Sequence, residues 1–181
     1  MGDTFKVNVL EEAVNNKKKV VLFWYPKDFT FVCPTELHAF QAALPEFEKR
    51  NTIVIGASCD TPEVHFAWLS AAKDNGGIEG VTYPLLADSN RNLSKTGTVQ
   101  VEGDNVTYRA TYIIDEEGVV QHESINNMPL GRNVGEYIRL VDALTHVQEK
   151  GEVCPANWEE GKQAMAPNAK GTAEYLAAYV N

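Results

Sequence analysis

The residue types best suited to chemistry lie together in the segment PKDFTFVCPTE, residues 26–36, directly after a run of apolar residues. Pro34 suits the start of a helix, where its missing N–H costs nothing, so Cys33 is predicted to lie at or next to the helix N-cap. There the thiol faces unpaired backbone N–H groups and the positive end of the helix dipole, and both favour the thiolate. The pattern therefore favours a nucleophilic Cys33 over a small buried apolar residue, which is the commonest state of a free cysteine. Glu36, three residues further on, is placed to reach back to the N–H of the cap.

The other two cysteines have different surroundings. Cys59 ends a predicted strand with no Pro or Arg beside it, so we expect a buried structural thiol. Cys154 lies in a loop-like sequence near the C-terminus. Because three cysteines cannot all pair within one chain, either some thiols stay reduced or one bond joins two chains.

The composition narrows the function classes. With 181 residues, of which 44% are hydrophobic and 23% charged, the chain reads as one ordinary globular domain. The 25 acidic and 16 basic side chains argue against a nucleic-acid partner, because such binding rests on clustered Lys and Arg. The longest apolar run is about a third of the roughly 20 residues that a bilayer demands, and no signal peptide is visible. We therefore expect a cytoplasmic chain with no membrane partner.

The histidines give no sign of a metal site. Neither Cys nor His recurs at metal-ligand spacing, so neither a metal nor a cofactor is expected. We interpret His38 and His65 as surface or packing residues.

Hydrophobic periodicity predicts the elements that must position these groups. Strands are predicted at residues 5–9, 20–25, 53–57, 83–87, 111–115 and 119–123, and the last two form a hairpin. Helices are predicted at residues 37–47, 64–72 and 134–147. This order indicates an α/β fold with a central mixed sheet flanked by helices. Pro45 is expected to kink the first of these helices near Leu44.

The residues after Gly151 differ from the rest of the chain. They are rich in loop-forming residues, and only residues 173–180 have the pattern of a further helix. We expect residues 1–151 to form the domain and residues 152–181 to form a C-terminal tail that is the most mobile part.

Four motifs carry a family resemblance that runs from about Phe5 to Tyr179. YPKDFTFVCPTEL, with the spacing Pro-x3-Thr-x2-Cys, resembles the active-site loop of the typical two-cysteine peroxiredoxins. GEVCPANW around Cys154 resembles their resolving-cysteine segment. Arg109 before TYIID and Arg132 at the end of MPLGR match two further positions. The resemblance implies a thioredoxin-like fold and a thiol-specific peroxidase with an antioxidant role.

The resemblance also implies a role for each matching residue. Cys33 would attack hydrogen peroxide or an organic hydroperoxide and become a sulfenic acid, and Cys154 of a second chain would resolve it as an inter-subunit disulfide. The supporting residues implied are Thr30, Pro26, Arg109, Glu36 and Arg132. Thr30 would aim its hydroxyl at the sulfur and the peroxide, Arg109 would favour the thiolate, and Pro26 would shield the pocket from water.

The partners follow from the same resemblance. A thioredoxin-like protein or a flavoprotein disulfide reductase would reopen the disulfide, because the chain has no CxxC of its own. A homodimer is implied, with five dimers often forming a decamer through the region around the Cys33 loop. Phe29 and Phe31 could serve there or belong to the pocket or core.

The sequence departs from the family pattern in two places that bear on function. Relatives usually begin with about fifteen more residues that include a first strand, an estimate taken from the resemblance, so an edge strand could be missing. Residues 75–80, NGGIEG, resemble the Gly-Gly-Leu-Gly insertion of peroxide-sensitive members, whereas Leu176 stands where they have Phe. Because both features are thought to hold the Cys33 loop folded, we expect intermediate sensitivity to overoxidation.

Two other function classes remain open at this point. A thiol-disulfide exchanger would share the α/β fold but needs a second cysteine nearby, and the nearest to Cys33 is Cys59, on a different strand. An oligomeric holdase chaperone is the stronger alternative, because overoxidised peroxiredoxin rings can act in that way. The preferred peroxide, the reductant and the choice between dimer and decamer also remain open.

Overall fold

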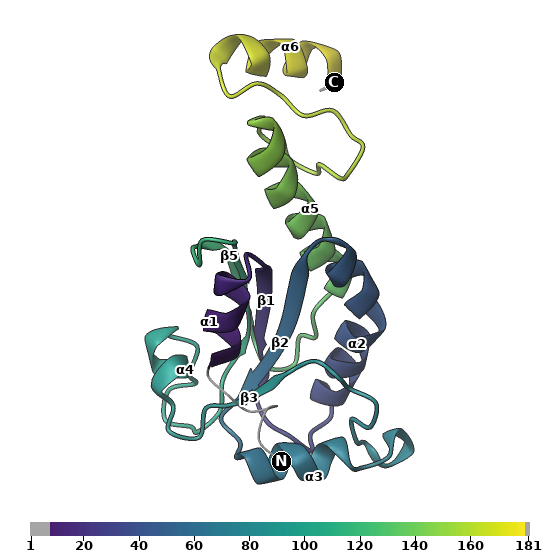
Figure 1. Ribbon diagram of the computed structural model, residues 1–181, viewed down its shortest axis with the longest axis vertical. Coiled ribbons are helices and arrows are strands. Elements are labelled where there is room, and N and C mark those ends of the chain that lie inside the picture. The colour runs from purple at the N-terminus through teal and green to yellow at the C-terminus, as the bar shows by residue number, and fades with distance from the viewer. Residues whose placement is uncertain (1–7, 180–181) are drawn as a thin grey trace. The chain divides into compact units, whose positions relative to one another are not determined.

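The fold alternates strands and helices along the chain, in a computed structural model that describes residues 8–179 (Figure 1). The helices are α1 (Asn8–Asn15), α2 (Cys33–Lys49), α3 (Pro62–Leu69), α4 (Asn92–Thr96), α5 (Val134–Lys150) and α6 (Ala169–Tyr179). The strands are β1 (Lys19–Trp24), β2 (Thr52–Ser58), β3 (Leu85–Ala87), β4 (Arg109–Ile114) and β5 (Val120–Asn126). A short 3-10 helix, η1, spans Lys73–Asn75.

The strands form one five-stranded sheet in the order β3-β2-β1-β4-β5. β1 is parallel to β2, and β2 is parallel to β3, whereas β4 runs antiparallel to both β1 and β5. The predicted mixed sheet is confirmed, with β1 in its centre.

The central strand β1 is buried over its whole length because helices cover both faces of the sheet. Val20, Leu22 and Trp24 belong to a core cluster on the side of α1. On the other face, Phe23 stacks on Phe40 of α2 with ring centroids 4.1 Å apart. This two-sided burial explains why the sequence of β1 is apolar without alternation.

The N-terminal prediction fails where the structure can test it. Phe5 and Val7 lie outside the described residues, and Val9 lies in α1 instead of a strand. Val9, Leu10 and Ala13 have helical spacing and pack in the core cluster next to β1. A stretch of five residues is too short for alternation to exclude a helix.

The helix that follows the reactive segment begins as the sequence predicts. α2 starts at Cys33, its N-cap is Val32, and Pro34 lies in its first turn. It continues without a break through Pro45, and the kink expected there remains a prediction. α5 ends just before Gly151, which has a φ of 66° that suits glycine after a helix.

The chain forms two compact units, which divide after Val134. The first contains the sheet with α1 to α4, and the second contains α5, the segment around Cys154 and α6, which begins four residues earlier than expected. In residues 8–179, no helix is long and apolar enough to cross a membrane.

Candidate active site

Cys33 lies fully buried at the start of α2, directly after the loop that leaves β1. β1 ends at Trp24 in the centre of the sheet, so the loop delivers Cys33 to the carboxyl end of the central strand. Pro26 in this loop is buried as well. In the first turn of α2, Pro34 has no N–H, and the N–H groups of Thr35 and Glu36 bond the carbonyl of Val32, so what favours a thiolate here is the positive end of the helix dipole.

Arg109 is the cation closest to the sulfur. It is the first residue of β4, and the antiparallel pairing of β4 with β1 brings it to the same end of the sheet as Cys33. Its Nη1 lies 3.4 Å from the Sγ of Cys33, and its Nε donates to the carbonyl of Met128 at 2.6 Å. The guanidinium is 4% exposed, so its attraction for a sulfur anion is little screened by water.

Glu36 binds both site arginines and does not cap α2. Its Oε2 accepts from Arg109 Nη1 at 2.6 Å and from Arg132 Nη2 at 2.8 Å. Its Oε1 accepts from the Nε of Arg132 at 2.9 Å and from the backbone N–H of Arg132 at 3.0 Å. The expected reach back to the helix cap is absent, because two buried guanidinium groups are stronger partners for a carboxylate than one N–H.

Arg132 fixes this arrangement to the sheet. Its Nη1 donates to the carbonyl groups of Trp24 and Ala110, each at 2.9 Å. Its guanidinium lies 4.9 Å from the ring centroid of Phe23, a cation–π distance. The Glu36 carboxylate therefore holds Arg109, and Arg132 holds Glu36 in turn. In this arrangement the Nη1 of Arg109 stays directed at Cys33.

Thr30 points its hydroxyl elsewhere in this structure. The hydroxyl donates to the carbonyl of Lys27 at 2.8 Å, which closes the turn before Cys33. The role expected of Thr30 toward the sulfur and the peroxide remains a prediction.

A buried polar network beside this loop was not predicted from the sequence. The Nδ1 of His65 lies 2.7 Å from Asp28 Oδ2, its Nε2 lies 3.3 Å from the carbonyl of Leu86, and Tyr25 OH lies 3.3 Å from the same Nδ1. Burial raises the pKa values of Tyr25 and Asp28. His65 is fully buried in an ion pair with Asp28, so the surface alternative is excluded and the packing alternative holds, with a charged partner that was not predicted. No local pattern in the sequence marks this pair, because its members are far apart in the chain.

The two loop phenylalanines are not part of the core. Phe29 is 55% exposed and has a left-handed φ of 53°, and its ring lies 5.8 Å from that of Trp68. Phe31 is 94% exposed. The core alternative for these side chains is therefore excluded in the single chain.

Cys59 lies directly after β2 and contacts α4. Its Sγ lies 3.7 Å from the Oγ of Ser94, and it is partly exposed where the sequence predicted burial. Burial still raises its pKa, which disfavours the thiolate. These features suit a bystander thiol.

Cys154 lies in the second unit, in the segment after α5. Its Sγ donates to the carbonyl of Ala143 at 3.7 Å, and Val153 pairs with Met165 in an isolated antiparallel bridge. All three cysteines are free thiols in the structure. Among residues 8–179, no three His, Cys, Asp or Glu side chains are grouped so that they could hold a metal ion.

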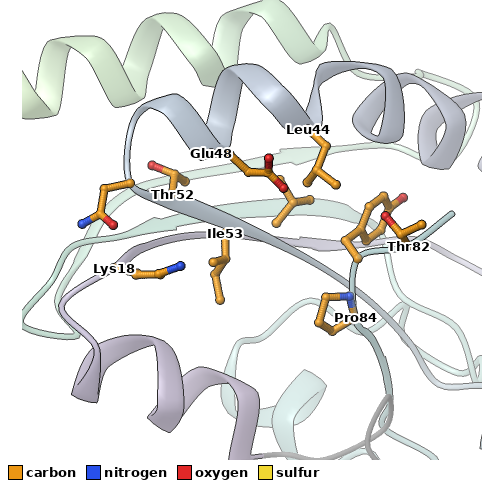
Figure 2. A pocket seen from close by; sticks show the side chains of 10 residues that line it. Lys18, Leu44, Glu48, Thr52, Ile53, Thr82 and Pro84 are labelled. Carbon is orange, nitrogen blue, oxygen red and sulfur yellow. The ribbon is translucent and has the colours of Figure 1, made fainter.

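A cavity of about 470 Å³ lies between α2, β2 and the segment before β3. Figure 2 shows Leu44 and Glu48 of α2 on one side of it, and Ile53 and Pro84 on the other. Neither Cys33 nor the arginines that contact Glu36 line this cavity, so it lies apart from the candidate chemistry.

The chain is similar to known proteins along most of its length. Residues 3–123 match the AhpC/TSA family, and residues 143–178 match the C-terminal domain of 1-Cys peroxiredoxin. The chain is 44% identical over 172 residues to the chloroplastic 2-Cys peroxiredoxin BAS1 of Hordeum vulgare, an alignment that covers 95% of this chain and 82% of that protein. It is 45% identical over 160 residues to the alkyl hydroperoxide reductase C of Helicobacter pylori, covering 88% of this chain and 80% of the relative.

A solved structure shares the architecture. The reduced 2-Cys peroxiredoxin of Plasmodium vivax superposes with a TM-score of 0.87 at 43% sequence identity, over 89% of this chain and 83% of the other. This likeness confirms the predicted thioredoxin-like α/β fold.

Proposed function

Because this chain belongs to the AhpC/TSA family of peroxiredoxins and is an enzyme that reduces peroxides through cysteine chemistry, we propose that Cys33 is its peroxidatic cysteine. The proposal rests on the position of Cys33. This residue begins α2, and its buried Sγ lies 3.4 Å from the Nη1 of Arg109. Burial raises the pKa values of Cys59 and Cys154, which disfavours the thiolate form of both.

The first step is a displacement at oxygen. The Cys33 thiolate attacks one peroxide oxygen, an S–O bond forms as the O–O bond breaks, and the departing oxygen takes a proton to leave as water or an alcohol. Arg109 stabilises the thiolate before the attack and the negative charge on the departing oxygen during it. Glu36 and Arg132 keep Arg109 in place, and buried Pro26 keeps water from the sulfur.

Thr30 completes the proposed site. Its hydroxyl lies in the loop three residues before Cys33 and is turned toward the carbonyl of Lys27. One rotation about its χ1 would release this hydrogen bond and let the hydroxyl donate to a bound peroxide.

The second step is resolution by Cys154 of another chain in a homodimer. The Sγ of Cys33 has no exposed surface, so the first turn of α2 must open before any thiol can reach it. The resulting inter-subunit disulfide is reopened by an external dithiol, supplied by a thioredoxin-like protein or a flavoprotein disulfide reductase. Such a cycle suits the cytoplasm, where thiols are kept reduced.

This cycle assigns a different function to each of two segments of the chain. Residues 1–151 act as the thioredoxin-like peroxidatic domain, and residues 152–181 act as the tail that carries the resolving cysteine. The exposed Phe29 and Phe31 on the loop before Cys33 support assembly of five dimers into a decamer through this region.

Peroxide consumption with an external dithiol tests the cycle. We expect Cys33→Ser to abolish turnover, and Cys154→Ser to keep one rapid oxidation of Cys33 but to lose sustained turnover. Cys59→Ser is the matched control and should retain the native rate. Full turnover by Cys33→Ser would overturn the proposal.

Nonreducing gel electrophoresis tests the inter-subunit bond. After one equivalent of peroxide the native chain should migrate as a covalent dimer, whereas Cys33→Ser and Cys154→Ser should each migrate as monomers. A monomer from the oxidised native chain would exclude the inter-subunit disulfide.

A further inference from the structure

Cys154 rests against one face of α5. Arg139, Ala143 and His146 are spaced four and three residues apart, so they lie on the same side of the helix. Cys154 Sγ donates to the carbonyl of Ala143, the central residue of the three, at 3.7 Å. Arg139 and His146 therefore flank the resting position of the thiol.

Both flanking residues also bind the segment that carries Cys154. His146 Nε2 lies 2.9 Å from Glu152 Oε2, and its ring lies 5.0 Å from that of Trp158. Arg139 Nη1 donates to the carbonyl of Trp158 at 3.0 Å. These contacts join the segment to α5 both before and after Cys154, so they fix the surrounding charges relative to the sulfur.

The charges around Cys154 have opposite effects on its thiolate. Burial raises the pKa of Cys154, Arg139 on α5 lowers it, and Glu152 on the thiol's own segment raises it. Glu136 binds the Arg139 guanidinium at 2.6 and 2.8 Å, and Glu159 also acts on Arg139. A protonated His146 offsets the charge of Glu152 through their ion pair.

We propose that Arg139, Glu152 and His146 are positioning residues that together set the thiolate fraction of Cys154. Arg139 increases that fraction, Glu152 decreases it, and His146 counters Glu152 through the contact between them. The inference rests on the proposed role of Cys154 as the resolving cysteine, because the thiolate is the form that resolves.

The reaction that this controls is disulfide formation. The Cys154 thiolate attacks the sulfur of the Cys33 sulfenic acid, the S–S bond forms, and the S–O bond breaks to release hydroxide, which takes a proton to become water. A larger thiolate fraction speeds this step and shortens the time during which a second peroxide can attack the sulfenic acid.

The test measures Cys154 directly in the full chain with Cys33→Ser and Cys59→Ser, where it is the only thiol. The rate of alkylation by iodoacetamide is followed from pH 6 to pH 10, and its midpoint gives the pKa of Cys154. We expect Glu152→Gln to move the midpoint down and Arg139→Gln to move it up. At pH 7 each alkylation rate should change on the order of threefold, the effect of one unit charge about 6 Å away in water.

His146→Phe separates charge from packing, because the phenyl ring keeps the contact with Trp158 but cannot carry a proton. We expect slower alkylation than in the parent chain, because Glu152 then acts on Cys154 without its ion-pair partner. Combined with Glu152→Gln, His146→Phe should have no additional effect, because the charge that it offsets is gone.

Glu174→Gln is the matched control. It removes the same charge from the same unit, but from α6, where Glu174 pairs with Lys170 at 3.7 Å. Its alkylation profile should match that of the parent. Equal profiles for Glu152→Gln, Arg139→Gln and Glu174→Gln in folded protein, checked by circular dichroism, would overturn the inference.

The measurement does not depend on peroxidase activity. The same substitutions in the chain with all cysteines should change the rate of disulfide formation after one peroxide equivalent in the same directions. Shifted alkylation profiles with unchanged disulfide rates would support the control of Cys154 and contradict its resolving role. The two proposals can therefore fail separately.

Discussion

Arg109, which contacts the Sγ of Cys33, is the residue whose loss should most directly slow the oxidation of Cys33. Arg109→Gln removes the charge beside the Sγ and leaves Glu36 with Arg132 as its remaining buried partner. We expect the rate of the first Cys33 oxidation to fall about 10²- to 10³-fold, as for loss of one preorganised donor. Stopped-flow mixing with peroxide measures this rate, with the exposed Lys49→Gln on α2 as the control. A loss of less than threefold would show that Arg109 does not act on the reacting atoms.

A second prediction at residue scale concerns stability against pH. Burial raises the pKa of Asp115, but hydrogen bonds from Val119, Gln121 and Glu117 lower it by more, so its pKa lies below the usual value. A carboxyl with a depressed folded-state pKa stabilises the fold above its unfolded pKa of about 3.9 and stops doing so as the pH falls through the folded-state pKa.

Asp115→Asn should therefore lower the free energy of unfolding by about 1 to 3 kcal/mol at pH 7. The difference from the native chain should shrink as the pH drops below about 4. Urea unfolding at a series of pH values measures it. A difference that stays constant down to pH 2 would contradict the assignment to the charged carboxylate.

At the level of elements, hydrogen bonds join the segment with Gly76 and Gly77 to the helices α2 and α3. His38 Nε2 lies 3.0 Å from the carbonyl of Gly77, and Trp68 Nε1 donates to the carbonyl of Gly76 at 2.8 Å. A Cβ on Gly77 would lie 1.9 Å from the carbonyl oxygen of Ala71, so only glycine fits there. The segment that resembles the family's sensitivity motif is thus tied to both α2 and α3.

Gly77→Ala should loosen this segment. We expect a loss of about 2 to 4 kcal/mol in unfolding free energy, because backbone must move. If the segment holds α2 closed, disulfide formation should also quicken and more peroxide should be needed to convert Cys33 to sulfinic acid, as mass spectrometry can measure. Gly103→Ala is the control. Gly103 has a left-handed φ of 78°, so this substitution strains the backbone, but no atom lies within 4 Å of the new Cβ and the Gly-Gly segment is untouched. Unchanged sulfinic acid formation in Gly77→Ala would show that the segment does not control the overoxidation of Cys33.

The elements themselves were largely predictable. The apolar runs of β1 and β2 and the helical stripe of α5 are long patterns that local physics determines, and the structure has all three. α4 has only five residues, and its short polar sequence carries no amphipathic stripe. The start of α1 was predicted as part of a strand at residues 5–9, because five residues are too few to distinguish strand periodicity from helix periodicity.

For the molecule as a whole, Phe31 is the most exposed large apolar side chain among residues 8–179. At 94% exposure it contributes nothing to the core of the single chain. If it packs between dimers, Phe31→Ser should shift the reduced protein from decamer to dimer, as light scattering after size exclusion would show. The unfolding free energy of the dimer should stay within about 0.5 kcal/mol of the native value. A decamer that persists in Phe31→Ser would show that Phe31 is not needed for the contact between dimers.

The sequence alone was enough to place Cys33 at the start of a helix, because a cysteine followed by proline after an apolar run is a local pattern with a local cause. It also determined the alternation of strands and helices, and therefore the mixed sheet. Three arrangements depend on the tertiary fold: Glu36 binds two arginines, Asp28 and His65 form a buried pair, and Arg139 and His146 lie on the face of α5 that Cys154 contacts. The physical reason is that a charged side chain takes its strongest partner in space. Where that partner stands far away in the chain, periodicity and capping preferences hold no information about it.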